Sequence, residues 1–155
     1  MPLSKNCQIV QDYLDQFGLE LQVRELQDST RTAQEAADAV GCQLGQIVKS
    51  LIFRNGEQPL LFLVSGQNQL NVPKVSEQIG ITLEKADADF VRESTGFPIG
   101  GVPPVAHAKK MDVFIDRHLM TFDLVWAAAG TPHAVFPIKS ENLPRITGGR
   151  LIDVQ

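Results

Sequence analysis

The sequence predicts an α/β fold of the α+β type, with a mixed β-sheet surrounded by helices in a single domain over residues 1–155. Three observations support this. The predicted strands and helices do not alternate strictly, which argues against a sheet built from repeated strand–helix–strand units. The run Leu60–Val64 is apolar throughout, which is typical of a central strand covered on both faces. A chain of 155 residues that is 43% hydrophobic can also bury a core of its own.

The first third of the chain predicts a helix, a strand and a second helix. Apolar positions on one helical face predict a helix over 4–17. Alternating apolar residues then predict a strand over 19–26. Thr32, followed three residues later by Glu35, matches a capping box at the start of a short helix that ends at Gly41.

The middle of the chain predicts a β-hairpin followed by two helices. The strands of the hairpin cover 47–54 and 60–65, and Asn55-Gly56 is the turn signal, although the polar and proline residues that follow predict a loop longer than two residues. The two helices are expected over 73–79 and 86–94. The last third predicts three strands, a helix that begins at Ser140, and a terminal strand; the strands cover 111–116, 124–128, 134–138 and 151–154.

Lys49 is the first candidate for chemistry, because it lies inside an apolar strand. Strand alternation places it on the face of Ile47, Leu51 and Phe53, and places Val48, Ser50 and Ile52 on the other face. Burying a lysine is costly unless its charge is used or solvated. Two interpretations stay open: the ammonium serves a site, or the side chain reaches solvent from a strand edge.

The segment 96–104 contains six glycine or proline residues in nine positions, which excludes a regular element. Adjacent Gly100 and Gly101 allow a ligand to approach the backbone closely, and successive N–H groups can form a nest for an anion. The alternative is an ordinary rigid surface loop. A third segment, Ala127–Gly130, ends a strand in small residues and is followed by His133; it predicts either room for a ligand or tight packing.

Other site classes are not supported. No histidine, cysteine and carboxylate cluster has the spacing of a zinc site, so we expect no metal and no cofactor. No Gly-x-Ser-x-Gly motif is present, and Cys7 and Cys42 lack an evident histidine partner. The sequence also lacks a bilayer-length apolar stretch and a signal-peptide pattern, which predicts a cytoplasmic protein without a membrane partner.

Three segments in order resemble the YbaK/EbsC family of the prolyl-tRNA editing-domain superfamily. They are Gly45–Leu51, Gly100–Pro104 and Ala128–Gly130, and Thr30–Ala37 also resembles the start of that domain. The similarity is strongest over residues 22–148. It implies a freestanding, trans-editing aminoacyl-tRNA deacylase that hydrolyses the ester of a mischarged tRNA, with tRNA-Pro as one candidate substrate.

The resemblance also implies residue roles. The family lysine falls on Lys49, which is the catalytic candidate, and the family Gly-x-x-x-Pro motif falls on the Gly100–Pro104 segment. The predicted substrate-binding residues are Gly100, Gly101, Val102, Pro104, Gly130 and His133. Several family members carry a serine where this chain has Ala128 or Ala129, so a hydroxyl contact is expected to be absent there. We find no convincing general base, which favours hydrolysis that is metal-independent and assisted by the substrate's own ribose hydroxyl.

The net charge of −4 argues against an extensive nucleic-acid surface and against DNA. Residues 1–98 carry a charge of −5 and residues 99–155 a charge of +1, so we expect cations of the later part to receive the 3′ end of a tRNA. These are Lys109, Lys110, Lys139, Arg145 and Arg150. An aminoacyl-tRNA synthetase is a further expected partner. Two alternative functions are a non-catalytic module that binds aminoacyl-tRNA or a synthetase, and a hydrolase of small aminoacyl esters or amides.

Overall fold

The computed structural model describes residues 2–155 and contains an eight-stranded mixed sheet. Seven strands follow the order β1-β7-β6-β2-β3-β5-β8, and β4 pairs with β2 outside this path. The neighbours β2 and β3 are antiparallel, whereas β3 with β5, β5 with β8, and β2 with β6 are parallel. The strands are β1 (Arg24–Glu25), β2 (Ile47–Asn55), β3 (Gln58–Ser65), β4 (Glu84–Lys85), β5 (Asp112–Asp116), β6 (Leu124–Ala128), β7 (Ala134–Lys139) and β8 (Arg150–Ile152).

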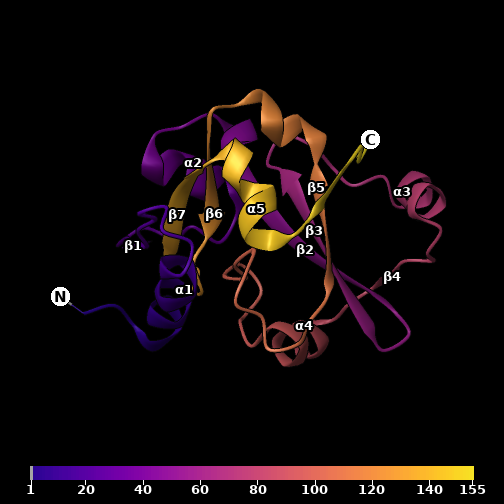
Figure 1. Cartoon of the computed structure of the whole chain (residues 1–155), viewed down its shortest axis with the longest axis horizontal. Coiled ribbons are helices and arrows are strands. Elements are labelled where there is room, and N and C mark those ends of the chain that lie inside the picture. Colours follow the sequence, from indigo (N-terminus) through magenta and orange to yellow (C-terminus); the bar gives the residue numbers. More distant parts are fainter. Residues whose placement is uncertain (1) are drawn as a thin grey trace.

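Helices pack around this sheet, which confirms the predicted fold class. Figure 1 shows α1 and α2 beside β6 and β7, α3 on the opposite side of the molecule, and α5 in front of the sheet. The α-helices are α1 (Lys5–Asp15), α2 (Ala33–Val40), α3 (Val72–Ile79), α4 (Ala88–Thr95) and α5 (Leu143–Thr147). Short 3-10 helices are η1 (Leu44–Gln46), η2 (Arg117–Thr121) and η3 (Ser140–Asn142). None of the helices in the described part of the chain is long and apolar enough to cross a membrane.

The core confirms the predicted role of β3 as a central strand. β3 lies between β2 and β5, and its residues from Pro59 to Ser65 are all buried. The two faces of β2 also follow the predicted alternation. Val48 and Ile52 pack with the cluster that contains α1 and the Gly/Pro loop, defined as residues 96–104, whereas Leu51 and Phe53 pack with the cluster that contains α3.

Local capping signals fix the ends of several helices. The capping box of Thr32 and Glu35 is present at the start of α2, and Gly41 ends this helix in the left-handed conformation, both as predicted. Asp87 caps α4, so this helix begins two residues later than expected, and it ends at Thr95. At the other end of the chain, residues 140–142 form η3, and the predicted final α-helix begins only at Leu143.

Two predictions about strands are wrong. The strand expected over 19–26 is reduced to Arg24–Glu25, because only these residues find a partner, in β7. Leu19 and Leu21 instead pack partly buried against the core from an extended segment. The hairpin loop between β2 and β3 is shorter than expected, because Asn55 pairs with Gln58 and leaves only two residues between the strands.

The edge of β2 that faces β6 is only partly paired, and this shapes the candidate site. β6 pairs with β2 at Ile47 and Val48, and β4 pairs with the same strand at Phe53 and Arg54. Residues 49–52 lie between these two pairings and have no strand partner on this side among residues 2–155. We call residues 49–52 the open edge of β2.

Candidate active site

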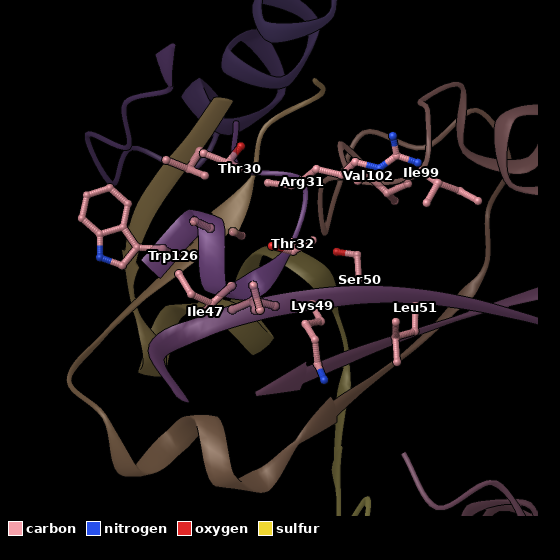
Figure 2. A pocket seen from close by; sticks show the side chains of 17 residues that line it. Thr30, Arg31, Thr32, Ile47, Lys49, Ser50, Leu51, Ile99, Val102 and Trp126 are labelled. Atoms are coloured by element: carbon pink, nitrogen blue, oxygen red, sulfur yellow. The ribbon is translucent and has the colours of Figure 1, made fainter. Parts of the chain in front are cut away.

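A cavity of about 370 Å³ lies beside the open edge of β2. Its size falls within the range of small-molecule sites. One wall is β2, a second is the end of β6, and the Gly/Pro loop and the segment before α2 complete it (Figure 2). Its lining residues are Thr30, Arg31, Thr32, Ala33, Ala36, Ile47, Val48, Lys49, Ser50, Leu51, Ile99, Gly100, Val102, Trp126, Ala127, Ala128 and Val135.

The peptide groups of Ser50 point toward this cavity. The Ile47 carbonyl accepts a hydrogen bond of 2.7 Å from the Gly66 N–H, just beyond the end of β3. Because peptide groups alternate between the two edges of a strand, those of Val48 and Ser50 point to the other edge, toward β6. The β2–β6 pairing ends at Val48, so it does not use the peptide groups of Ser50. The Ser50 hydroxyl is also buried without a hydrogen-bond partner among residues 2–155.

Lys49 lines the cavity, but its ammonium is directed elsewhere. Figure 2 shows its side chain leaving β2 on the side opposite the Ser50 hydroxyl. The half-buried Lys49 Nζ donates a hydrogen bond to the Asn68 carbonyl. Burial lowers the pKa of Lys49, and the negative charge of Asp116 offsets part of this effect.

Asp116 is the buried carboxylate behind Lys49, with an exposed fraction of 2%. Its Oδ2 accepts hydrogen bonds of 3.0 Å from both the Ser65 N–H and the Asn68 side-chain amide. Its Oδ1 accepts one of 2.9 Å from the His118 N–H. A carboxylate with three donors and a nearby ammonium is stabilised despite its burial. Asp116 therefore fixes the segment to which Lys49 is bound.

The Gly/Pro loop packs against the turn after β6. The Gly130 N–H donates to the Gly101 carbonyl at 2.9 Å, and a Cβ on Gly101 would lie 2.8 Å from the backbone of Thr131. Only glycine permits this approach. The Gly101 N–H donates to the Pro98 carbonyl at 3.0 Å, so it is already used within the loop. The N–H groups of Gly100 and Val102 have no acceptor within the described residues.

Gly100 also positions Arg31 at the mouth of the cavity. Gly100 has a φ of +88°, and a Cβ there would lie 2.6 Å from the Arg31 Cγ. The Arg31 side chain therefore lies directly over this glycine, and Figure 2 shows it extending past Val102 toward Ile99. The preceding residue is anchored, because the Thr30 N–H donates to the Pro132 carbonyl at 2.6 Å.

Comparison with known proteins now decides the family. The family model for the aminoacyl-tRNA editing domain matches residues 27–146, which include every residue that lines the cavity. The chain belongs to the aminoacyl-tRNA editing domain family. This confirms the resemblance to the YbaK-like proteins that the sequence indicated.

Relatives of this editing-domain protein include freestanding chains and parts of synthetases. It is 30% identical to the uncharacterised protein YwhH of Bacillus subtilis, over 94% of each chain. It is 37% identical to the proline–tRNA ligase of Kosmotoga olearia over 56% of its own length, but this segment spans only 15% of the ligase. A solved structure described as a candidate trans-editing enzyme for prolyl tRNA synthetase superposes with a TM-score of 0.93, at 45% identity and 99% coverage of both chains.

The structure of this editing domain places the predicted site residues at three different depths. Lys49, Gly100 and Val102 line the cavity. Gly101, Pro104 and Gly130 are buried and do not line the cavity. Gly101 and Gly130 join the Gly/Pro loop to the turn after β6 through the hydrogen bond between them. His133 is exposed outside the cavity, and its Nδ1 lies 3.1 Å from the Asp28 carbonyl oxygen.

Sequence reasoning missed Arg31, Thr30 and Ser50 as cavity residues. Thr30 is buried, and its hydroxyl, like that of Ser50, has no partner among residues 2–155. The signal available for Arg31 was its position directly before the capping box in a segment that resembles the family. The cations expected at the cavity mouth do not line it; these are Lys109, Lys110, Lys139, Arg145 and Arg150. Arg31 occupies that place instead.

The lining residues also limit the chemistry of the cavity. They include no histidine, cysteine, aspartate or glutamate. Nowhere in residues 2–155 do three such side chains gather in a way that could hold a metal ion. Burial raises the pKa of both Cys7 and Cys42, which disfavours their nucleophilic thiolate forms.

Proposed function

We propose that this protein is a freestanding trans-editing deacylase, which hydrolyses the ester bond of a mischarged aminoacyl-tRNA in the cavity beside the open edge of β2. One observation supports the proposal for this site: in an editing-domain fold, the cavity is lined by Lys49, Gly100 and Val102, and the N–H groups of the last two have no acceptor within the described residues. These are the groups that an ester hydrolase needs to stabilise negative charge.

The proposed reaction adds water to the ester carbonyl. The carbonyl oxygen gains negative charge in the tetrahedral intermediate, and the loop N–H groups stabilise it. The bond between the carbonyl carbon and the ribose oxygen then breaks, and the ribose oxygen takes a proton. The products are the free amino acid and a tRNA with an intact terminal ribose. The Gly101 N–H is already bonded within the loop, so we assign the charge stabilisation to Gly100 and Val102 instead of Gly101.

Lys49 supplies positive charge beside the cavity. Its ammonium is bound to the Asn68 carbonyl on the side of β2 opposite the Ser50 hydroxyl, so contact with a substrate phosphate or carbonyl requires that this hydrogen bond break and that the side chain turn around the open edge of β2. A lysine side chain has four rotatable bonds on its stem, which makes such an exchange possible. Its lowered pKa limits the pH range over which it carries charge.

We assign proton removal from the attacking water to the substrate. The residues that line the cavity include no carboxylate and no imidazole, whereas the terminal ribose carries a hydroxyl next to the ester. This hydroxyl can relay the proton as the water attacks. The same lining offers no usual metal ligands, so the proposed reaction is metal-independent.

The relatives support an assignment of the tRNA that is edited and of a protein partner. Proline–tRNA ligases share the matched domain, which supports tRNA-Pro as the edited tRNA and the corresponding synthetase as a partner. A function in translation also supports a cytoplasmic location. The full chain forms one domain in this proposal, because its strands belong to a single sheet. One core cluster also contains residues from both α1 and α5, near the two ends of the chain.

The test is a panel of mischarged tRNAs incubated with the purified protein. It contains alanyl-, cysteinyl-, seryl- and threonyl-tRNA, each prepared on tRNA-Pro and on a second tRNA body. We expect hydrolysis of at least one species well above the spontaneous rate, and a dependence on the tRNA body. Hydrolysis of none of them would contradict the proposal.

A non-catalytic binding module is the second candidate function. The observation that favours it is the alanine at positions 128 and 129, where several family members carry a serine. Binding of aminoacyl-tRNA without turnover across the panel would support this alternative. Turnover of free aminoacyl esters at the same rate as of aminoacyl-tRNA would instead indicate a small-ester hydrolase.

A further inference from the structure

A second hollow of about 310 Å³ continues the candidate active-site cavity along β2. The two share five lining residues, which are Ser50, Leu51, Ile99, Gly100 and Val102. The second hollow then extends past Phe53 and Val91 to Lys85 on β4. The two hollows therefore adjoin, and together they extend along β2 from the gap between β2 and β6 to β4. We call the two hollows together the β2 groove.

The charged residues that line the β2 groove are all cationic, although the protein as a whole carries a net charge of −4. They are Arg31, Lys49 and Lys85. The other two large hollows contain both signs of charge: one includes Asp116 and Asp153, and the other includes Glu20. The β2 groove is therefore more positively charged than the other two hollows, which favours the binding of a polyanion.

We propose that the single-stranded 3′ end of the tRNA lies along the β2 groove, with its phosphates bound by Arg31 and Lys85. The proposal rests on the deacylase function, because it takes the ester to be bound beside the open edge of β2. It adds the path of the nucleotides away from the ester. It also replaces the cations of residues 99–155 that the sequence suggested as the tRNA contacts.

The geometry of the groove suits a short single strand. Arg31 stands at the mouth of the first hollow, held over Gly100, and forms no ion pair within the described residues. Lys85 is exposed on the edge strand β4 at the far end, and it too forms no ion pair there. Both cations are therefore available for phosphate oxygens.

Between these cations lies Ile99, which lines both hollows and is 47% exposed. A large apolar side chain this exposed gains free energy when a flat base covers it. The groove thus presents a cation, an apolar surface and a second cation in sequence. This order matches the alternation of phosphate, base and phosphate along a nucleic-acid strand.

The test compares two substrates and two double variants. The substrates are the aminoacyl-tRNA that the panel identifies and the corresponding 3′-aminoacyl-adenosine, which lacks phosphates. The test variant is Arg31→Ala with Lys85→Ala. The matched control is Arg145→Ala with Lys110→Ala, which removes the same two residue types from exposed positions outside the groove.

For the test variant we expect kcat/KM on aminoacyl-tRNA to fall about tenfold at low salt, with no change on aminoacyl-adenosine. The slope of log kcat/KM against log salt should become shallower by about 1.4, because each contact to a single-strand phosphate contributes about 0.7. The control variant should leave the slope unchanged. Equal losses on both substrates, or equal effects of the two double variants, would overturn the proposal.

A direct binding measurement separates this inference from the proposed function. The probe is a fluorescent RNA microhelix with a 3′ end that carries alanine through a non-hydrolysable amide. Weaker binding by the Arg31 and Lys85 variant than by the control supports the path, even if no ester is hydrolysed. Hydrolysis by the wild type, together with equal binding of the microhelix by both variants, would keep the deacylase function and reject the path.

Discussion

The two sides of β2 differ in how their polar groups are bonded. On the side of Lys49, the ammonium, the Asn68 amide and the Asp116 carboxylate bond to one another or to backbone groups. On the side of Ser50, the hydroxyl has no partner in the described residues. The amides of Gly100 and Val102, in the loop that covers this side, likewise have no acceptor there.

This difference separates structural from binding roles. Buried polar groups are normally hydrogen-bonded, since an unpaired one costs about 1–3 kcal/mol. The bonded network of Lys49, Asn68 and Asp116 holds the strands β2, β3 and β5 in register. On the side of Ser50, the hydroxyl and N–H groups that are unpaired within residues 2–155 raise the free energy of the folded protein, and a ligand that bonds to them can offset this cost. We therefore expect substitutions in the Asp116 network to change mainly stability, and those in the Gly/Pro loop to change substrate turnover. Lys49 is bonded on the first side but is expected to affect turnover, because the proposed reaction uses its charge.

The largest effect on stability is expected for Asp116→Ala. The change leaves the N–H groups of Ser65 and His118 and the Asn68 amide without their acceptor, beside a half-buried ammonium. Breaking a buried charged network costs about 3–5 kcal/mol. The free energy of unfolding in urea measures this loss. As a control, Asp153→Ala removes an exposed carboxylate paired with Arg117, and should cost less than about 1 kcal/mol. Similar costs for both would contradict a structural role of the Asp116 network.

A smaller effect distinguishes Gly100 from Gly18, a second glycine with a positive φ. Gly100→Ala forces an alanine into the left-handed region, which costs about 1–2 kcal/mol, and brings its Cβ against Arg31. Gly18→Ala imposes the same left-handed cost at a φ of +66°, with no atom within 4 Å of the new Cβ. We expect both variants to lose stability and only Gly100→Ala to lose deacylation activity.

Two serines on the same face of the paired strands test the cost of an unpaired hydroxyl, since Ser65 opposes Val48 and therefore shares a face with Ser50. The Ser65 hydroxyl donates to the buried Gly45 carbonyl at 2.7 Å, so Ser65→Ala should destabilise the protein by about 1–2 kcal/mol. Ser50→Ala removes a buried hydroxyl without a partner and should therefore stabilise the protein, by up to about 1–3 kcal/mol. Thermal or urea unfolding of the two variants measures both. Equal losses would show that the Ser50 hydroxyl is bonded in the folded protein.

The smallest expected effect is on the pH profile. Burial lowers the pKa of Lys49, so its ammonium loses the proton at a lower pH than an ordinary lysine. If the charged form supports turnover, enzymatic kcat/KM should fall as the pH rises through this lowered pKa, after the spontaneous hydroxide-dependent rate is subtracted. Lys49→Arg, which stays charged at every accessible pH, should lack this basic limb. A wild-type profile without a fall on the basic side would contradict the role of the charge.

Local signals in the sequence were sufficient where the physical cause is local. The capping box of α2 and the fully apolar run of β3 depend only on neighbouring residues, and both predictions are confirmed. The strand expected over 19–26 failed because alternation cannot show whether a partner strand is present, and the partner extends along only two residues. β4 was missed for the same reason, since it is a two-residue strand defined by its pairing with β2.

The candidate site shows the same limit. Lys49 and the Gly/Pro loop stand out because their residue types are unusual in their local context, and the family resemblance joins them. Arg31 and Lys85 are ordinary surface cations in the sequence. Only the tertiary fold brings Arg31 over Gly100 and places Lys85 at the end of the same groove. Charge counted along the chain therefore pointed to the wrong cations for the cavity mouth.

The central claim is that ester hydrolysis takes place in the cavity beside the open edge of β2 and depends on the charge of Lys49. The most direct measurement is the deacylation rate of Lys49→Met on the aminoacyl-tRNA that the wild type hydrolyses. This variant keeps an unbranched apolar stem and removes the ammonium. We predict a loss of about 100-fold or more in kcat/KM, with a cooperative unfolding transition retained. Wild-type deacylation by a folded Lys49→Met protein would contradict the account.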